Sequence, residues 1–549
     1  MERGIVNSFF EILSYCLFMT DQINPLKALT FFPFSFIIYS ITSKGGVFMT
    51  LEEALQKFDE IQQKLFALEY ASSAIYLDAV TVAPSDTAAG RSMATGILRG
   101  YIYPLAAGEE TGQVLDVLIQ HKDSLDEIKR REVEEMKRSY DESHRMPEKE
   151  YVEYSILLND AQDIWHKAKA ANDYASFAPY LEKIIATKRR LATYIDENKA
   201  PYDALLGQYE RGLTSSQLDE FFAGLRKTIV PLLHRIQTEG ASIDDSFLFL
   251  EYPVAQQRQL SDYLMEILGI DRAHCTIGET EHPFTLNFDK NDVRITTKYL
   301  THNLASSMYS VIHESGHALY ELGIGDEYQH TSLAGGVSMG VHESQSRLYE
   351  NMLGRSEPFI QLIFPKLQEL FPEQLAGVTP HQLYLAVNKA QPSLVRTEAD
   401  ELTYCLHIMV RYEIEKLMMD GKVSVAELPA LWAEKMQEYL GVEVPNDTAG
   451  VLQDSHWSGG MIGYFPSYAI GSAYAAQFIH RMEQDLPVYD CVAKGDFKTI
   501  NAWLDEHIHQ YGCFYPAKEL FERCCQEPFN PQYYTDYLTR KFSAIYGLK

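Results

Sequence analysis

The chain has 549 residues, of which 46% are hydrophobic and 23% charged, as is typical of a globular protein with a sizeable core. Its 48 Lys and Arg residues stand against 76 Asp and Glu residues, which gives a net charge of -28. A surface of that charge repels nucleic acid and anionic lipid, so we exclude both as partners. The 7 cysteines are scattered and form no C-x-x-C pair. This usage indicates a reducing compartment, and we expect a cytoplasmic protein.

Residues 1–48 differ in composition from the rest of the chain. Their longest apolar run, residues 28–41 (ALTFFPFSFIIYSI), is interrupted by Pro33 and falls short of the ~18 residues that a membrane-spanning helix needs. No small-residue cleavage site follows it. Met49 resembles a natural protein start, with Thr50 as the N-cap of a helix. We therefore interpret residues 1–48 as an extension outside the fold, consistent with a start-site artefact, and a membrane anchor is the alternative.

From Leu51 onward the hydrophobic pattern is helical. Apolar residues recur at spacings of three and four along the first predicted helix, at Leu51, Leu55, Phe58, Ile61, Leu65 and Leu68. Helical or charge-interleaved patterns continue over residues 116–168, 159–194, 215–237 and 399–549, whereas short alternating patterns occur near 284–288 and 338–342. The sequence predicts a mainly α protein with only minor short strands. We expect residues 49–549 to form one unit, with two helical lobes flanking a groove.

The sequence His313-Glu314-Ser315-Gly316-His317 is an H-E-x-x-H motif within a predicted helix at residues 297–322, which Gly323 is expected to end. Histidines four residues apart lie on one face of a helix. Two such imidazoles can bind one zinc ion, and the intervening glutamate can activate water on the metal. The alternative is a pair of ordinary core or surface histidines.

A catalytic zinc site needs a third protein ligand and an open position for water. Glu343 begins a second predicted helix, residues 343–352, which would bring its carboxylate to the metal by packing antiparallel to the first. His342 and Glu350 carry equally suitable donor atoms. The spacing leaves these three candidates open.

Six sequence words occur in a fixed order: His282-Pro283-Phe284, Asp292-Val293-Arg294-Ile295-Thr296, His313-Glu314-Ser315-Gly316-His317, His342-Glu343-Ser344-Gln345, Val395-Arg396-Thr397-Glu398-Ala399-Asp400 and Gly450-Val451-Leu452-Gln453-Asp454-Ser455-His456-Trp457. With these words the chain resembles the carboxypeptidase Taq family (thermostable carboxypeptidase 1) of zinc metallocarboxypeptidases, over about residues 49–549. The resemblance implies a helical fold with a deep groove, a homodimer, and a single catalytic domain. It also implies one Zn2+ per chain, for which Co2+ or Mn2+ can substitute.

Position by position, the resemblance makes His313, His317 and Glu343 the metal ligands and Glu314 the general base. An oxyanion intermediate needs a further hydrogen-bond donor. The candidates are His456, Tyr464 and Tyr468, each with a structural role as the alternative.

Recognition of a free α-carboxylate suits the planar, bidentate guanidinium of arginine. Arg294 and Arg396 stand in the two arginine-containing words and are the candidates. Asp292 and Asp400 would orient these arginines or a zinc-binding histidine. His282 is expected to contact substrate, with a buried hydrogen-bonding role as the alternative.

These inferences predict an enzyme that removes single C-terminal residues, with broad specificity, from peptides that have a free C-terminus. A zinc oligopeptidase or dipeptide-releasing peptidase of the same fold is one alternative. A non-catalytic metal- or peptide-binding protein is another, and the intact Glu314 disfavours it, because a binding protein needs no general base. No membrane contact is expected for residues 49–549.

Overall fold

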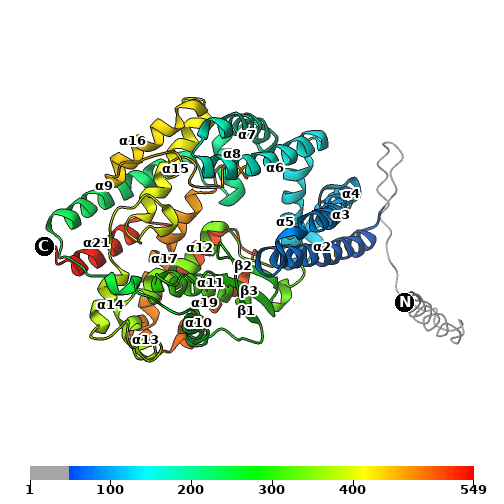
Figure 1. Ribbon diagram of the computed structural model, residues 1–549. Helices are drawn as coiled ribbons and strands as arrows, with labels where there is room; N and C mark the ends of the chain where they lie inside the picture. Colours follow the sequence, from blue (N-terminus) through cyan, green and yellow to red (C-terminus); the bar gives the residue numbers. More distant parts are fainter. Residues whose placement is uncertain (1–48) are drawn as a thin grey trace, which may run out of the picture. The chain divides into compact units, whose positions relative to one another are not determined.

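Thr50 caps the first helix of the described residues, α2 (Leu51–Thr81), with reciprocal hydrogen bonds. Its side chain accepts from the backbone N–H of Glu53, and the Glu53 carboxylate accepts from the backbone N–H of Thr50. This capping box satisfies two N–H groups that a helix start otherwise leaves unpaired. The predicted N-cap is confirmed. The computed structural model describes residues 49–549 (Figure 1), so the interpretation of residues 1–48 lies outside the described part.

Helices make up most of the described chain. Before the sheet they are α2, α3 (Ala88–Ala107), α4 (Glu109–Gln120), α5 (Glu127–His144), α6 (Glu148–Ala171), α7 (Tyr174–Ile195), α8 (Pro201–Tyr209), α9 (Ser215–Glu239) and α10 (Val254–Leu268). After it follow α11 (Leu304–Gly323), α12 (Met339–Arg347), the π-helix η5 (Leu348–Gly354), α13 (Glu357–Leu370), α14 (Pro380–Val387), α15 (Tyr404–Asp420), α16 (Leu428–Leu440), α17 (Pro466–Asp485), α18 (Val488–Lys494), α19 (Phe497–His507), α20 (Ala517–Cys525) and α21 (Gln532–Tyr546). The predicted mainly α fold with only minor short strands is confirmed.

A three-stranded sheet precedes α11, with β1 (Cys275–Glu279), β2 (Thr285–Asp289) and β3 (Asp292–Thr297) in the order β1-β3-β2. The central strand β3 pairs parallel to β1 and antiparallel to β2. Val293 and Ile295 of β3 are fully buried, and β3 packs against α11. The sheet therefore forms a fixed base beside the helix that carries the H-E-x-x-H motif (Figure 1).

Three local predictions need correction. The strand predicted near residues 284–288 is confirmed as β2. The strand predicted near residues 338–342 is wrong, because Ser338 caps α12 by accepting from the Val341 N–H and the helix begins at Met339. The helix predicted from residue 297 begins at Leu304 instead, because Asn303 provides its N-cap. The second predicted helix begins at Met339 rather than at Glu343, and it continues as the π-helix η5.

Two glycines allow three helices to approach one another closely. A Cβ atom on Gly316 of α11 would lie 2.7 Å from the Gln345 carbonyl oxygen and 2.8 Å from Ser346 Cα, both in the α12 backbone. A Cβ atom on Gly471 of α17 would lie 2.6 Å from the Glu343 Cβ. Helix α12 is therefore held between α11 and α17 at distances that larger residues would prevent.

Within residues 49–549, no helix combines the length and the apolar character that crossing a membrane requires.

Replacing Gly471 with Ala should lower the free energy of unfolding by about 1–3 kcal/mol, because the added methyl group overpacks the contact with Glu343. Chemical denaturation monitored by circular dichroism measures this change. Gly224→Ala is the matched control, since that glycine also lies within a helix and an added Cβ would meet no atom within 4 Å. The control should be neutral or more stable by up to about 1 kcal/mol. Equal stability of both variants would contradict the close-contact account.

Candidate metal centre

Three side chains from α11 and α12 converge on one point. His313 Nε2 lies 3.7 Å from Glu343 Oε2, and His317 Nε2 lies 3.6 Å from the same oxygen. Within residues 49–549 these three residues are the only group of His, Cys, Asp and Glu whose ligand atoms come close enough to hold a metal ion. The structure thus brings together the three residues predicted as ligands.

The donor set fits a catalytic zinc ion, which typically takes two imidazoles and one carboxylate at about 2.0–2.2 Å. Atoms that share such an ion are separated by less than about 4.4 Å, and the observed spacings of 3.6 and 3.7 Å meet this condition. The side chains of His313 and His317 remain 19% and 15% exposed. The centre therefore keeps a side that water and substrate can reach.

Each histidine is oriented by a second hydrogen bond on its Nδ1 atom. His313 Nδ1 lies 2.9 Å from Glu350 Oε2, and because a carboxylate only accepts, Nδ1 donates and Nε2 keeps its lone pair. His317 Nδ1 lies 2.6 Å from His342 Nδ1, and His342 Nε2 lies 2.6 Å from a carboxylate oxygen of Glu321. Because Glu321 only accepts, His342 Nε2 donates to it, and His342 Nδ1 accepts from His317 Nδ1. The Nε2 atom of His317 is therefore left with a free lone pair. Glu350 and His342 thus contact His313 and His317 through their Nδ1 atoms, and do not reach the point where the two Nε2 atoms and Glu343 converge.

Glu343 is oriented by its own neighbours on α12. Arg347 Nε donates to Glu343 Oε1 at 2.7 Å, and the Ser346 hydroxyl lies 3.1 Å from Oε2, the oxygen that faces the histidines. Burial alone would raise the pKa of Glu343, but Arg347 and the two histidines hold it well below its usual range. Burial lowers the pKa of His317 to about 3, so this imidazole is neutral, as metal binding requires.

Glu314 is held beside the centre by the sheet. The Thr285 hydroxyl of β2 donates to Glu314 Oε2 at 2.7 Å, and burial raises the pKa of this carboxyl. Two residues along the same face of β2, Asn287 Nδ2 donates to Glu321 at 2.5 Å. One face of β2 therefore orients both the predicted general base and the carboxylate behind His342.

The predicted oxyanion donors form a second cluster. His456 Nε2 lies 3.4 Å from the Tyr468 hydroxyl, and the His456 ring stacks on Tyr464. Burial raises the pKa of both tyrosines, and the charge of Glu343 raises it further, so both phenols are neutral and can donate hydrogen bonds near this predicted metal ligand.

Arg396 joins this second cluster to the metal centre. Its guanidinium lies over the Tyr468 ring at 5.2 Å, and Nη1 donates to the Tyr404 hydroxyl at 3.3 Å. Arg347 also contacts Tyr404, because its guanidinium stacks over the Tyr404 ring at 4.2 Å while it donates to Glu343. A short path of contacts therefore connects Arg396 with Glu343, the predicted metal ligand.

The remaining predicted residues lie elsewhere. Arg294 forms a bidentate ion pair with Asp292, with both hydrogen bonds at 2.7 Å, so Asp292 orients this arginine as expected. Asp400 accepts from the backbone N–H groups of Leu402 and Thr403 and shapes the turn before α15, instead of orienting an arginine. His282 lies exposed before β2, which argues against the alternative of a buried hydrogen-bonding role.

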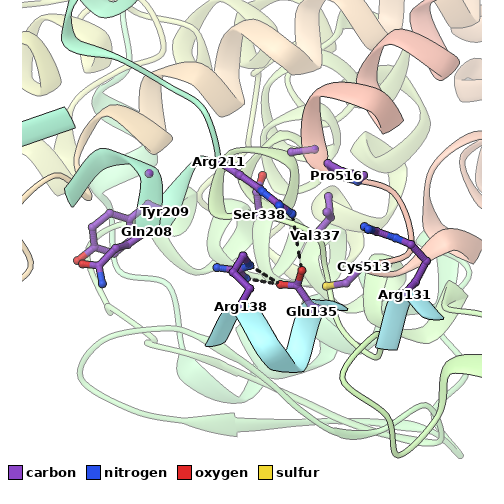
Figure 2. Close-up of a pocket in the computed structure, with 12 residues that line it drawn as sticks. Arg131, Glu135, Arg138, Gln208, Tyr209, Arg211, Val337, Ser338, Cys513 and Pro516 are labelled. Carbon is purple, nitrogen blue, oxygen red and sulfur yellow. Dashed lines mark hydrogen bonds and ion pairs between the residues drawn. The ribbon is translucent and has the colours of Figure 1, made fainter. Parts of the chain in front are cut away.

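A separate cavity of about 60 Å³ lies at the start of α12, where Ser338 lines it (Figure 2). Glu135 of α5 points between Arg138 and Arg211 and forms an ion pair with each of them. None of the predicted site residues is among the described residues that line this cavity. The ion pair between Glu135 and Arg211 connects α5 to the segment that follows α8.

Sequence reasoning missed four residues that shape the centre: Thr285, Asn287, Glu321 and Arg347. Two of them carried a usable signal, because Glu321 and Arg347 lie four residues after His317 and Glu343 and so share their helix faces. Thr285 and Asn287 act across a strand–helix contact that no local pattern reveals.

Comparison with known proteins identifies extensive relatives. Residues 57–542 match the family described as carboxypeptidase Taq (M32) metallopeptidase. Carboxypeptidase 1 of Bacillus subtilis (strain 168) is 39% identical over 494 residues, which cover 90% of this chain and 99% of the relative. Thermostable carboxypeptidase 1 of Pyrococcus furiosus is 35% identical over 496 residues, with 90% and 98% covered.

Solved structures show the same similarity in three dimensions. The M32 carboxypeptidase from Deinococcus radiodurans R1 superimposes with a TM-score of 0.88 at 34% identity, covering 90% of this chain and 99% of that one. Metallocarboxypeptidase 1 of Trypanosoma cruzi gives a TM-score of 0.86 at 32% identity, with 90% and 100% covered.

Replacing His342 with Phe should lower metal affinity about 10- to 100-fold, because His317 loses the acceptor that fixes its tautomer. Titration of the metal-free protein with zinc in a competing chelator measures the affinity. His330→Phe is the control, since His330 is an exposed histidine whose ring nitrogen contacts Asp289. Unchanged zinc affinity in His342→Phe would show that the histidine pair does not support the metal site.

Proposed function

Since the chain belongs to the carboxypeptidase Taq (M32) family of metallopeptidases, we propose that it uses one zinc ion to release single C-terminal residues from peptides with broad specificity. Family membership makes the protein a hydrolase of peptide bonds and a metal-dependent carboxypeptidase. The finer points, which are the ion, the residues that hold it and the general base, are the substance of the proposal.

The convergence of His313 Nε2, His317 Nε2 and Glu343 Oε2 carries the proposal. These residues would hold the ion, and both imidazoles are already in the tautomer that offers Nε2. When bound, zinc supplies a Lewis acid that polarises the peptide carbonyl and makes water a better nucleophile. Co2+ and Mn2+ accept the same nitrogen and oxygen donors and can substitute.

Glu314 acts as the general base in this proposal. One of its carboxylate oxygens accepts a proton from the attacking water, and the same group delivers that proton to the nitrogen of the leaving amine. The hydrogen bond from Thr285 fixes the carboxylate, so the proton acceptor does not have to be reoriented for each turnover.

The second cluster would bind the polar groups of the substrate. The Tyr464 and Tyr468 hydroxyls, with His456, would donate to the oxyanion that develops at the scissile carbonyl. Arg396 would bind the substrate α-carboxylate, because its contacts place it next to both this cluster and the metal ligand. Arg294 and His282 remain proposed substrate contacts on the sheet side.

Replacing Glu314 with Gln should reduce kcat by about 100- to 10,000-fold, because the amide cannot accept the water proton. The zinc content should stay at one ion per chain, as elemental analysis of the purified protein can determine. Glu327→Gln, at an exposed position just beyond α11, serves as the control and should keep full activity. A Glu314→Gln enzyme with normal turnover would exclude this residue as the base.

Amidation of a peptide C-terminus should abolish cleavage, because the amide lacks the charge that Arg396 would bind. Mass spectrometry of products from a free peptide and its amide tests this expectation. Release of one residue at a time from the free peptide alone supports the carboxypeptidase. Cleavage of the amidated peptide would indicate an oligopeptidase, and loss of two residues per step a dipeptide-releasing enzyme.

A further inference from the structure

Two arginines share one carboxylate behind the proposed substrate site. Arg396 Nε and Nη2 each lie 3.0 Å from Asp454 Oδ1. Arg411 Nε donates to the other oxygen, Oδ2, at 2.6 Å, and Arg411 Nη2 contacts Oδ2 as well. Each oxygen of Asp454 therefore binds a different guanidinium. The Arg411 side chain is fully buried, at 0% exposure.

Arg411 is held rigidly in this position. Its Nη1 donates to the backbone oxygen of His407 at 2.8 Å, and its Nη2 donates to Gln453 Oε1 at 2.9 Å. The same Gln453 oxygen accepts from the backbone N–H of Arg396 at 2.8 Å. Trp432 covers the guanidinium at 4.6 Å. Arg411 thus fixes both the side-chain and the backbone partner of Arg396.

The sharing weakens the hold of Asp454 on Arg396. An isolated arginine–carboxylate pair tends to form two parallel hydrogen bonds, one to each oxygen. Arg411 occupies Oδ2, so Arg396 binds only through Oδ1. Its guanidinium donates one further hydrogen bond, a long one from Nη1 to the Tyr404 hydroxyl at 3.3 Å, and otherwise lies against the ring of Tyr468.

The charges of the group formed by Arg396, Arg411 and Asp454 do not balance. Two guanidinium groups face a single carboxylate, and the neighbouring imidazoles are neutral, because burial and the arginines lower the pKa of His456 to about 4 and that of His407 to about 3. Glu415, one turn after Arg411, accepts from Tyr202 and Trp457 rather than from a guanidinium. The buried cluster therefore carries a surplus positive charge, which an incoming anion can neutralise.

We infer that Arg411 is a positioning residue for the substrate α-carboxylate. By holding Asp454 Oδ2, it leaves Arg396 with N–H groups and positive charge that a second carboxylate can bind. The inference rests on the proposed function, in which Arg396 contacts that carboxylate. Arg411 itself lies too deep to touch the substrate.

Arg411→Gln in the zinc-loaded enzyme tests the inference. The probes are N-acetyl-L-phenylalanine and N-acetyl-L-phenylalaninamide, which differ only in the carboxylate and are each tested as an inhibitor of peptide cleavage. We define the inhibitor ratio as the inhibition constant of the amide divided by that of the acid. This ratio should fall by about tenfold or more, because hydrogen bonds to charged groups are the strong ones. KM should rise by more than kcat falls. Arg411→Lys, which keeps the charge but loses the fork, should recover part of the ratio.

Trp432→Phe is the matched control, because it disturbs the packing on Arg411 without changing any charge. A merely structural role for Arg411 would reduce folded enzyme in both variants but leave the inhibitor ratio unchanged. If Arg411→Gln does not fold, the inhibitor ratio of Arg411→Lys is used instead. A ratio below that of the wild-type enzyme supports the role of Arg411, and an unchanged ratio overturns it.

Two variants, Arg396→Gln and Arg411→Gln, separate the inference from the proposed function. A fall of the inhibitor ratio in Arg396→Gln and in Arg411→Gln supports both the inference and the proposed function. Loss in Arg396→Gln alone overturns the role of Arg411 and leaves the proposed function standing. An unchanged ratio in Arg396→Gln overturns the assignment of Arg396, and the role of Arg411 with it.

Discussion

The close packing of α12 between α11 and α17 determines where Glu343, the proposed third metal ligand, lies. Gly316 lets the backbone of α12 approach the H-E-x-x-H helix, and Gly471 lets α17 press against the Glu343 side chain. Because protein interiors are packed as densely as organic crystals, a methyl group added to either glycine would displace the Glu343 carboxylate. The geometry of the centre is therefore a consequence of helix packing rather than of the motif alone.

A second constraint is that buried charges need partners. Glu321 and Glu350 would be costly in this interior if they were unpaired, and each instead accepts a hydrogen bond from an imidazole. The pairing fixes both ligand histidines in the tautomer that offers Nε2. The same principle operates at Asp454, where sharing between two arginines leaves a positive surplus. In the proposed function, the group around His313, His317 and Glu343 binds a cation, whereas the group around Asp454 supports the binding of an anion.

Helical periodicity and motif spacing predicted the mainly α fold, the motif helix and its end at Gly323. They missed β3, because its alternation of polar Asp292 and Arg294 with buried Val293 and Ile295 is short and ends at two buried threonines, and because its parallel partner β1 is not adjacent in sequence. Spacing also could not choose among His342, Glu343 and Glu350. Their directions depend on how α12 rotates against α17 and on its passage into the π-helix η5, and tertiary packing sets both.

The most direct test of the account is the location of the metal. Crystals of the zinc-loaded protein, measured at the zinc absorption edge, should show one anomalous peak per chain. We expect it within about 2.0–2.2 Å of His313 Nε2, His317 Nε2 and a Glu343 oxygen. A peak bound by His342 or Glu350 in place of Glu343, or no peak between the two histidines, would contradict the account.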